Sequence, residues 1–359
     1  MPCAKRRSIS RALLLAAALA GPVALAAAAP AGGDAPPAAP EHLRDTGLYA
    51  DPERRAVDPA HLTFAPQYAL WTDGAAKRRW ISLPPGSRID ASDPDDWRFP
   101  VGTRVWKEFA FDGRPVETRY MERLPDGTWL YAAYAWNPEG TDALRVGPAG
   151  RRRAYPLPGG ASHVIPGVQD CKACHEGQAS RVLGFSALQL SPDRDPRAPH
   201  AEPPPAGSVD LAGLAATGLL EGLPPALLAD PPRIRAPTAE ARAALGYLHG
   251  NCGHCHDRSG PLASLGLVLR HPALAPEATP PPALATTLGV PARRLGSEGA
   301  TRIHPGDPDL SLLVQRAASR APTLQMPPLG TATVDHDAVR LLRAWIAQLD
   351  PKPTRRPDP

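Results

Sequence analysis

The chain has 359 residues, with 40 Lys and Arg against 36 Asp and Glu and a formal net charge of +4. Its 47 Pro and 31 Gly are too few for a wholly low-complexity chain, so we expect packed domains with proline-bearing loops. Four basic residues among the first 26 account for the charge excess. The remaining chain is balanced, which argues against a nucleic-acid-binding protein.

Residues 1–26 predict a secretory signal peptide. A basic start at Lys5 to Arg11 precedes an apolar run at 13–20 and the small residues Ala24 to Ala26. A membrane anchor is the alternative, but the apolar run is short for a bilayer span. We therefore expect a periplasmic or secreted protein whose mature chain has no membrane span. Two disordered segments are expected, a lead-in at 27–40 and a tail at 351–359.

Residues 41–155 predict an antiparallel β domain. Aromatic and β-branched residues fill three runs that turn sequences separate, at 103–111, 116–124 and 128–136. In the middle run Val116 and Tyr120 fall on one face, and Glu117 and Arg119 on the other. We expect a meander that closes on itself or forms a small sandwich. Five tryptophans are expected in its core, or alternatively on a carbohydrate-binding face: Trp71, Trp80, Trp106, Trp129 and Trp136.

Two copies of a Cys-X-X-Cys-His pattern follow, Cys171–His175 and Cys252–His256, 81 residues apart. This spacing is that of covalent haem c attachment. Two thiols add to the porphyrin vinyl groups, and the next histidine binds the iron. Once Cys3 leaves with the signal, these motifs hold every cysteine, so none remains for a disulfide. Zinc binding is the alternative, but a histidine directly after the second cysteine in both copies favours two haem c groups.

Residues 156–235 predict the first haem region, with proline-rich linkers around the first motif. Prolines are dense at 192–205 and at 224–237, where they deny the backbone a regular fold. Between these linkers Asp210 is expected to cap a short helix that runs to Leu220.

Residues 236–350 predict a mostly helical second haem domain. Thr238 is expected to cap a helix that ends at His249, directly before the second motif. From His271 to Arg302 prolines are frequent, and no helix is expected.

Two further helices are expected on either side of a loop that contains Met326. Asp307, with Pro308 at the first helical position, predicts the earlier helix, and Asp335 opens the last one. Two prolines follow Met326 and stiffen its loop. Because of this position, we expect Met326 to be the sixth ligand of the second haem. A thioether opposite histidine would raise the reduction potential of that haem.

The order of helix, motif, loop, helix, methionine loop and helix from Thr238 to about Asp350 resembles a class I cytochrome c. Nearly the whole mature chain resembles a family of secreted bacterial dihaem c-type cytochromes with a β-rich N-terminal region. Besides the two motifs, the matching stretches are Gly47–Pro52, Tyr68–Pro85, Phe99–Gly102, Tyr134–Asn137, Val182–Phe185, Pro305–Pro308 and Met326–Pro328. The resemblance implies haem binding and electron transfer, without a settled substrate or partner. The expected fold class is multidomain α+β, an N-terminal antiparallel β domain followed by mostly α-helical cytochrome c-type haem domains.

The expected site residues divide into attachment cysteines and iron ligands. They are Cys171, Cys174, His175, Cys252, Cys255, His256 and Met326, with iron bound by His175, His256 and Met326. The sequence leaves the sixth ligand of the first haem open. His163 ranks first because it lies eight residues before Cys171, and the rivals are His200, His249, His304, Met121 or an open position. His254, inside the second motif, is expected to point toward solvent or a propionate.

Three functions follow from these sites. The first is a periplasmic electron carrier that exchanges electrons with a redox partner protein. The second is a dihaem peroxidase or oxidase, which would keep the first haem five-coordinate. The third is a redox-linked binding module built on the β domain. We favour the carrier, because no clear acid–base pair stands near the first motif in the sequence.

Overall fold

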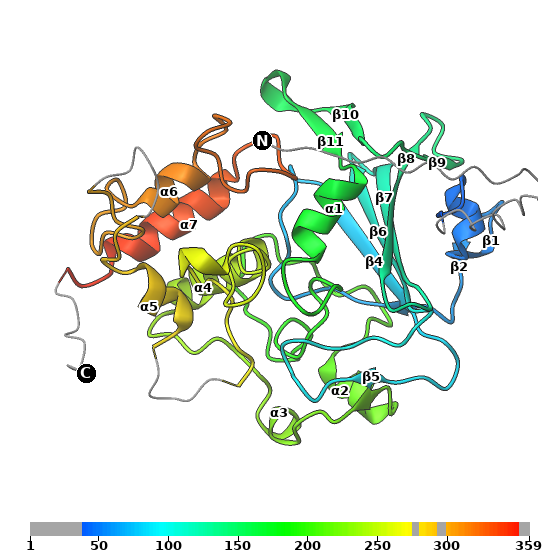
Figure 1. Ribbon diagram of the computed structural model, residues 1–359, viewed down its shortest axis with the longest axis horizontal. Coiled ribbons are helices and arrows are strands. Elements are labelled where there is room, and N and C mark those ends of the chain that lie inside the picture. The colour runs from blue at the N-terminus through cyan, green and yellow to red at the C-terminus, as the bar shows by residue number, and fades with distance from the viewer. Residues whose placement is uncertain (1–37, 275–279, 293–298, 352–359) are drawn as a thin grey trace, which may run out of the picture. The chain divides into compact units, whose positions relative to one another are not determined.

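The largest element of the computed structural model is a six-stranded antiparallel sheet with the strand order β3-β4-β6-β7-β8-β9 (Figure 1). The structure describes residues 38–274, 280–292 and 299–351. The strands are β3 (Leu62–Thr63), β4 (Ala76–Ser82), β6 (Arg104–Phe111), β7 (Arg114–Arg123), β8 (Trp129–Trp136) and β9 (Ala143–Arg145). The predicted signal peptide, most of the predicted lead-in and residues 352–359 lie outside the described residues.

The three predicted strand runs are confirmed to within two residues as β6, β7 and β8. Asp112 (φ 48°) and Gly113 (φ 75°) join β6 to β7 in the left-handed backbone conformation that a two-residue hairpin requires. The expectation of a closed meander or a sandwich is wrong. Neighbours in the sheet follow chain order, and the sheet ends at β3 and β9, short edge strands that do not pair with each other.

The other paired strands form two-stranded ribbons. They are β1 (Tyr49–Asp51) with β2 (Ala56–Val57), β10 (Arg151–Pro156) with β11 (Ser162–Ile165), and β5 (Ile89–Asp90) parallel to β12 (Leu220–Glu221). The parallel pair brings residue 220 beside residue 89, so the chain after the first motif returns to the N-terminal region.

Both faces of the sheet are covered. On one face Trp80, Trp106 and Trp136 are buried together, as predicted, whereas Trp71 and Trp129 are only partly buried. On the other face Val105, Met121 and Tyr131 join a core cluster that also contains residues of the C-terminal helices. Glu117 and Arg119, the predicted polar face of β7, therefore point into the protein rather than into solvent.

The prediction of mostly α-helical haem domains is wrong. The helices are α1 (Val168–His175), α2 (Leu211–Ala216), α3 (Ala226–Ala229), α4 (Ala239–Asn251), α5 (Pro282–Thr287), α6 (Leu312–Ala317) and α7 (His336–Ala347). Of the helices in the described residues, only α4 and α7 exceed eight residues, and the protein is β-rich. Proline removes a backbone donor and clashes with the preceding turn, so proline-dense segments cannot sustain long helices.

Capping residues predict helix starts well, with one exception. The side chains of Asp210, Thr238 and Asp335 accept from the backbone N–H three residues later, as expected for helix caps. The predicted Asp307 cap is wrong: its carboxylate accepts from Asp309 and Leu310 in a turn, and α6 starts only at Leu312. The predicted absence of helix between His271 and Arg302 is also wrong, because α5 lies there with a proline in its first turn.

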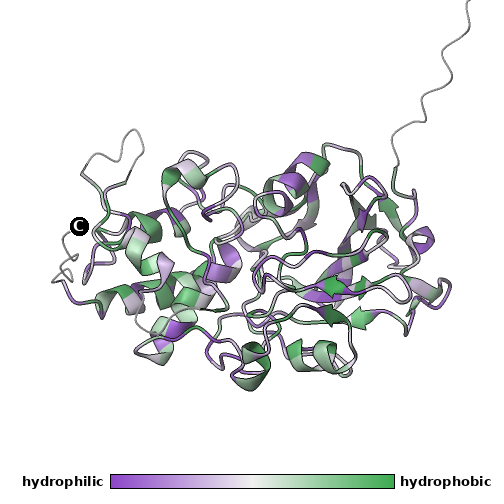
Figure 2. Ribbon diagram, turned by 60° about the horizontal axis from the view of Figure 1, so that its bottom comes forward, coloured by the Kyte–Doolittle hydropathy of each residue, from purple (hydrophilic) through white to green (hydrophobic). Residues whose placement is uncertain are grey.

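Helix packing places both motifs near the sheet. Helix α1 packs beside β8, and α4 packs against α7 (Figure 1). Figure 2 shows hydrophobic residues on the strands as well as on the helices, which agrees with a core shared between them. No helix in the described part of the chain is long and apolar enough to cross a bilayer.

Candidate cofactor site

The first motif lies on helix α1. The helix starts after Gly167, whose N–H donates to the Asp170 carboxylate at 3.0 Å. Cys171 and Cys174 are three residues apart on this helix, so their thiols emerge one turn apart, the spacing needed for two bonds to one macrocycle.

His175 is held as a neutral imidazole. Its Nδ1 lies 2.7 Å from the Arg181 carbonyl oxygen and donates to it, which leaves Nε2 with a free lone pair. Burial lowers the pKa of His175 to about 4, although the bond to Arg181 opposes the shift. The ring also packs against Tyr131, with centroids 5.6 Å apart. A neutral ring with a fixed tautomer is the form that binds iron.

The second motif begins where α4 ends. Asn251, the last residue of α4, accepts from the Trp71 N–H at 2.7 Å and donates to the Ala69 carbonyl at 3.1 Å. After the motif, Asp257 accepts from Arg270 at 2.9 Å, and Arg270 also binds Asp96. The motif is therefore fixed on both sides by contacts to the N-terminal half of the chain.

His256 is buried, with 8% of its surface exposed. Burial lowers its pKa to about 4. Its Nδ1 has no hydrogen-bond partner among the described residues. A neutral buried imidazole with an unused nitrogen has the character of a ligand, but its orientation is not fixed by a hydrogen bond as that of His175 is.

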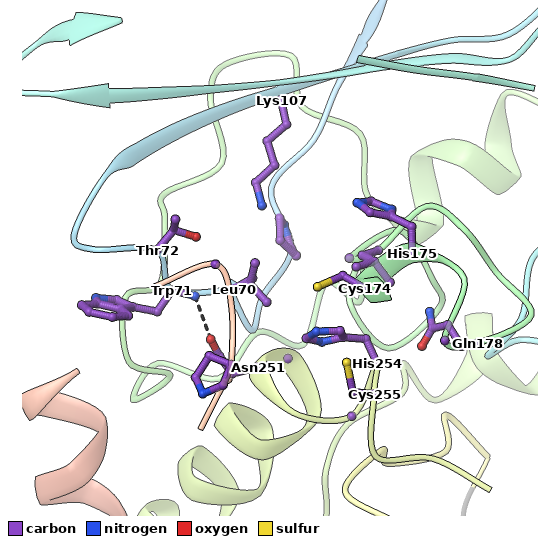
Figure 3. A pocket seen from close by; sticks show the side chains of 18 of the residues that line it. Leu70, Trp71, Thr72, Lys107, Cys174, His175, Gln178, Asn251, His254 and Cys255 are labelled. Atoms are coloured by element: carbon purple, nitrogen blue, oxygen red, sulfur yellow. Dashed lines mark hydrogen bonds between the residues drawn. The ribbon is translucent and has the colours of Figure 1, made fainter. Parts of the chain in front are cut away.

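The two motifs touch each other. The Cys255 Sγ lies 4.0 Å from the Ala173 carbonyl oxygen, and the ligand atoms of Cys174, His254 and Cys255 all lie within 4.8 Å of one another. His254 is 9% exposed and lines the cavity beside the first motif (Figure 3), so the expected orientation toward solvent is wrong, and the alternative, a contact with a propionate, stays a prediction. A separation of 81 residues in sequence becomes direct contact in the fold.

A cavity of about 410 Å³ lies at this contact (Figure 3). Five of the seven predicted site residues line it: Cys171, Cys174, His175, Cys255 and Met326. Cys252 and His256 are not among its lining residues. The volume is within the roughly 300–1,000 Å³ range of small-molecule and cofactor pockets.

Met326 lies in the loop between α6 and α7, as predicted. Its N–H donates to the Arg316 carbonyl at 3.0 Å. Further along the loop, the Asp73 carboxylate accepts from the N–H groups of Ala332 and Thr333, at 2.7 and 3.0 Å. The loop is thus tied to α6 at one end and to the N-terminal region at the other.

His163, the leading candidate for the sixth ligand of the first haem, is engaged elsewhere. Its Nδ1 lies 3.2 Å from the Asp73 carboxylate and its Nε2 lies 3.0 Å from the Glu117 carboxylate, and the ring is fully buried. Burial alone would lower the pKa of His163, but the two carboxylates outweigh it and raise the pKa. Neither nitrogen is free for iron.

None of the other predicted histidines is placed to bind iron at the first motif. Nε2 of His200 lies 2.8 Å from the Asp335 carboxylate, and His304 does not line the cavity. Nδ1 of His249 accepts from the His271 N–H at 3.1 Å, and burial lowers the pKa of His249 to about 3. In that neutral ring Nε2 carries the proton and has no lone pair for iron.

Met121 remains from the predicted set, since it is buried and lines the cavity. Two further lining residues, Lys107 and His254, were not among the predicted candidates for this position. The sequence pattern could have identified Lys107 as a cavity residue, because alternation along β6 places it on the same face as the buried Val105 and Phe109.

The residues present fit haem c at the first motif. All four motif cysteines are free thiols, and burial raises the pKa of Cys171 to about 11, so it is held as a thiol. The hydrogen bond on His175 Nδ1 is the feature that orients a proximal ligand. At the second motif, Nδ1 of buried His256 has no hydrogen-bond partner among the described residues, so no such bond prevents the ring from turning to bind iron.

Comparisons with protein-family models, with curated proteins and with solved structures found no match for this chain.

Proposed function

We propose that this protein is a periplasmic dihaem c-type electron carrier. The observation that carries the proposal is the meeting of two Cys-X-X-Cys-His motifs at one cavity, where Cys255 approaches Ala173 at 4.0 Å. Two redox groups attached there would lie close enough for direct exchange. Haem c supplies reversible one-electron chemistry at iron when bound.

The chain's own residues would attach, orient and shield the groups. Cys171 and Cys174 would form two thioether bonds from α1, and Cys252 and Cys255 two more from the end of α4. His175 is oriented by Arg181, and Met326 approaches the cavity from a loop that Asp73 anchors. Buried Tyr131 and Met121 line the cavity and would shield an attached group from water.

The test is the mass and iron content of the chain after export in a cytochrome-maturing host. We expect two haem masses per chain, a pyridine haemochrome spectrum of c type and no disulfide. The matched control replaces Cys252 and Cys255 by Ser, which should leave one haem. A chain with no covalent haem would refute the proposal.

Zinc binding is a second candidate, favoured by one observation. Cys174, His254 and Cys255 bring two sulfurs and a ring nitrogen within 4.8 Å of one another, and such donors suit zinc. This reading predicts zinc in a chain that lacks haem, and a loss of zinc in His254→Ala. The same elemental analysis separates the two candidates.

A further inference from the structure

Three cations face each other across the middle of the sheet. Arg79 on β4 pairs with Lys107 on β6, and Lys107 pairs with Arg119 on β7, each in direct register. We refer to these three residues as the cation ladder. Like charges directly opposite one another destabilise a sheet, so this arrangement needs a compensating feature.

The outer members of the ladder have carboxylate partners. Arg79 binds Glu202 at 2.5 Å, and Arg119 binds Glu117 at 2.6 Å. Glu202 also lies 3.9 Å from the buried ammonium of Lys77, and Glu117 is shared with His163. These two carboxylates are therefore already divided among several cations.

The central member has no such partner. Among the described residues, the Lys107 ammonium forms no ion pair or hydrogen bond and only lies over the Phe109 ring, 4.9 Å from the centroid. The same ring faces the Arg119 guanidinium at 4.3 Å. A cation–π contact offsets only part of the cost of bringing an ammonium next to two guanidinium groups.

The ladder opens into the cavity. Arg79, Lys107 and Arg119 all line it, and Lys107 reaches from its strand toward the side where Cys174 and His175 lie (Figure 3). Burial, reinforced by Arg79 and Arg119, holds the pKa of Lys107 well below its usual range. A negative group in the cavity would restore the charged ammonium and neutralise the ladder.

We propose that the cation ladder is an anion subsite of the cavity, in which the Lys107 ammonium binds a carboxylate. A carboxylate fits because its two oxygens can accept from Lys107 and from a flanking guanidinium at once. The carboxylate has two sources, a propionate of an attached haem or a small free carboxylic acid. The site itself stands without the haems, so it does not fail if the proposed function fails.

The experiment uses the full exported chain as purified, with four variants. Lys107→Met and Lys107→Gln remove the charge, and Lys107→Arg keeps it. Arg145→Met removes an exposed cation from β9 of the same sheet and is the matched control. Sodium acetate is titrated into each protein by calorimetry at constant ionic strength, and the pH dependence of each haem potential is recorded by optical redox titration.

A free-acid site predicts saturable acetate binding by the wild type, weakened by about tenfold in both neutral variants, as one charge-assisted hydrogen bond implies. Lys107→Arg and Arg145→Met should bind as the wild type does. A propionate site predicts no acetate binding, but a shifted pH dependence of one haem potential in the neutral variants alone.

Two results would overturn the inference. In the first, the neutral variants match Arg145→Met in both measurements. In the second, they convert a low-spin haem to high spin, which would make the Lys107 amine an iron ligand instead of an anion site. Absence of any haemochrome marks failure of the proposed function, and the acetate titration then decides the anion site alone.

Discussion

At the scale of single residues, His163 connects three parts of the chain. From β11 it reaches Asp73 and, on β7, Glu117, and Asp73 in turn accepts from the loop that carries Met326. Arg119 also binds Glu117, and together with His163 it outweighs burial and lowers the pKa of that carboxylate. Asp73, Glu117, Arg119 and His163 thus form a charge network. Only the Arg119 side chain is partly exposed, and the other three side chains are buried.

The network predicts a stability that depends on pH. Because the pKa of His163 is raised on folding, its contribution is complete below the unfolded value near 6.5 and is lost as pH rises through the folded pKa. The lowered pKa values of Asp73 and Glu117 mean that their contribution is lost as pH falls below about 4. The network should therefore stabilise most between about pH 5 and 6.5.

The variant His163→Gln tests this. It should lower the free energy of unfolding by about 3–5 kcal/mol at pH 6, because it leaves the buried Asp73 carboxylate without its cationic partner and Glu117 with Arg119 alone. The loss should be smaller at pH 9, because the stabilisation that comes from a raised histidine pKa is lost as pH rises. Urea unfolding at both pH values measures it, with exposed His336→Gln as the control. An equal loss at both values would contradict the assignment of a protonated His163.

Met326 gives the second prediction at this scale. Met326→Ala removes the thioether, so one haem should become high-spin or water-ligated and its reduction potential should fall by on the order of tenths of a volt. Leu329→Ala, in the same loop and also lining the cavity, controls for loosened packing. If absorption and potential match those of the control, the ligand is not Met326.

At the scale of elements, the sequence predicted most strands and helix starts correctly, but it did not predict which distant segments pack together. Alternation predicted β6 to β8, and side-chain caps predicted the starts of α2, α4 and α7. The Asp307 cap failed because the same side-chain bonds also build a turn. That α1 and the second motif touch follows from packing of segments 81 residues apart, and no local pattern carries that information.

The contact between the motifs depends on glycine. A Cβ on Gly177 would lie 2.6 Å from the His254 carbonyl oxygen, so the backbone of the second motif would have to move. We expect Gly177→Ala to cost about 1–3 kcal/mol of stability, as overpacking does. If the chain carries the two proposed haems, the substitution should also slow electron exchange between them.

Gly147→Ala is the matched control for that variant, because nothing lies within 4 Å of its Cβ position. Its stability should stay within about 0.5 kcal/mol of the wild type. Urea unfolding and pulse-radiolysis kinetics measure the two effects. If Gly177→Ala exchanges electrons between haems at the wild-type rate, the close contact of the motifs does not govern transfer.

At the scale of the whole molecule, the coordination of the two irons would separate a carrier from a peroxidase. A carrier keeps both irons six-coordinate, because fixed ligands on both sides keep reorganisation small. A peroxidase needs one open position and a nearby group that moves a proton. The cavity offers Met121 and His254 as internal ligands for the first site. The same His254 could instead serve a peroxidase as its proton carrier. Whether the first iron is six-coordinate or has an open position therefore decides between the two functions.

We expect the oxidised protein to show two low-spin haems by electron paramagnetic resonance and two separated potentials in a redox titration. It should consume no hydrogen peroxide. His254→Ala and Met121→Ala then identify the ligand of the first haem, because only the variant that removes it should produce a high-spin signal. A wild-type protein with a high-spin haem that turns over peroxide at roughly 1–10³ s⁻¹, the usual enzymatic range, would instead establish the peroxidase. In that case His254→Ala should abolish turnover while leaving the spin state unchanged, because the histidine would move protons without binding iron.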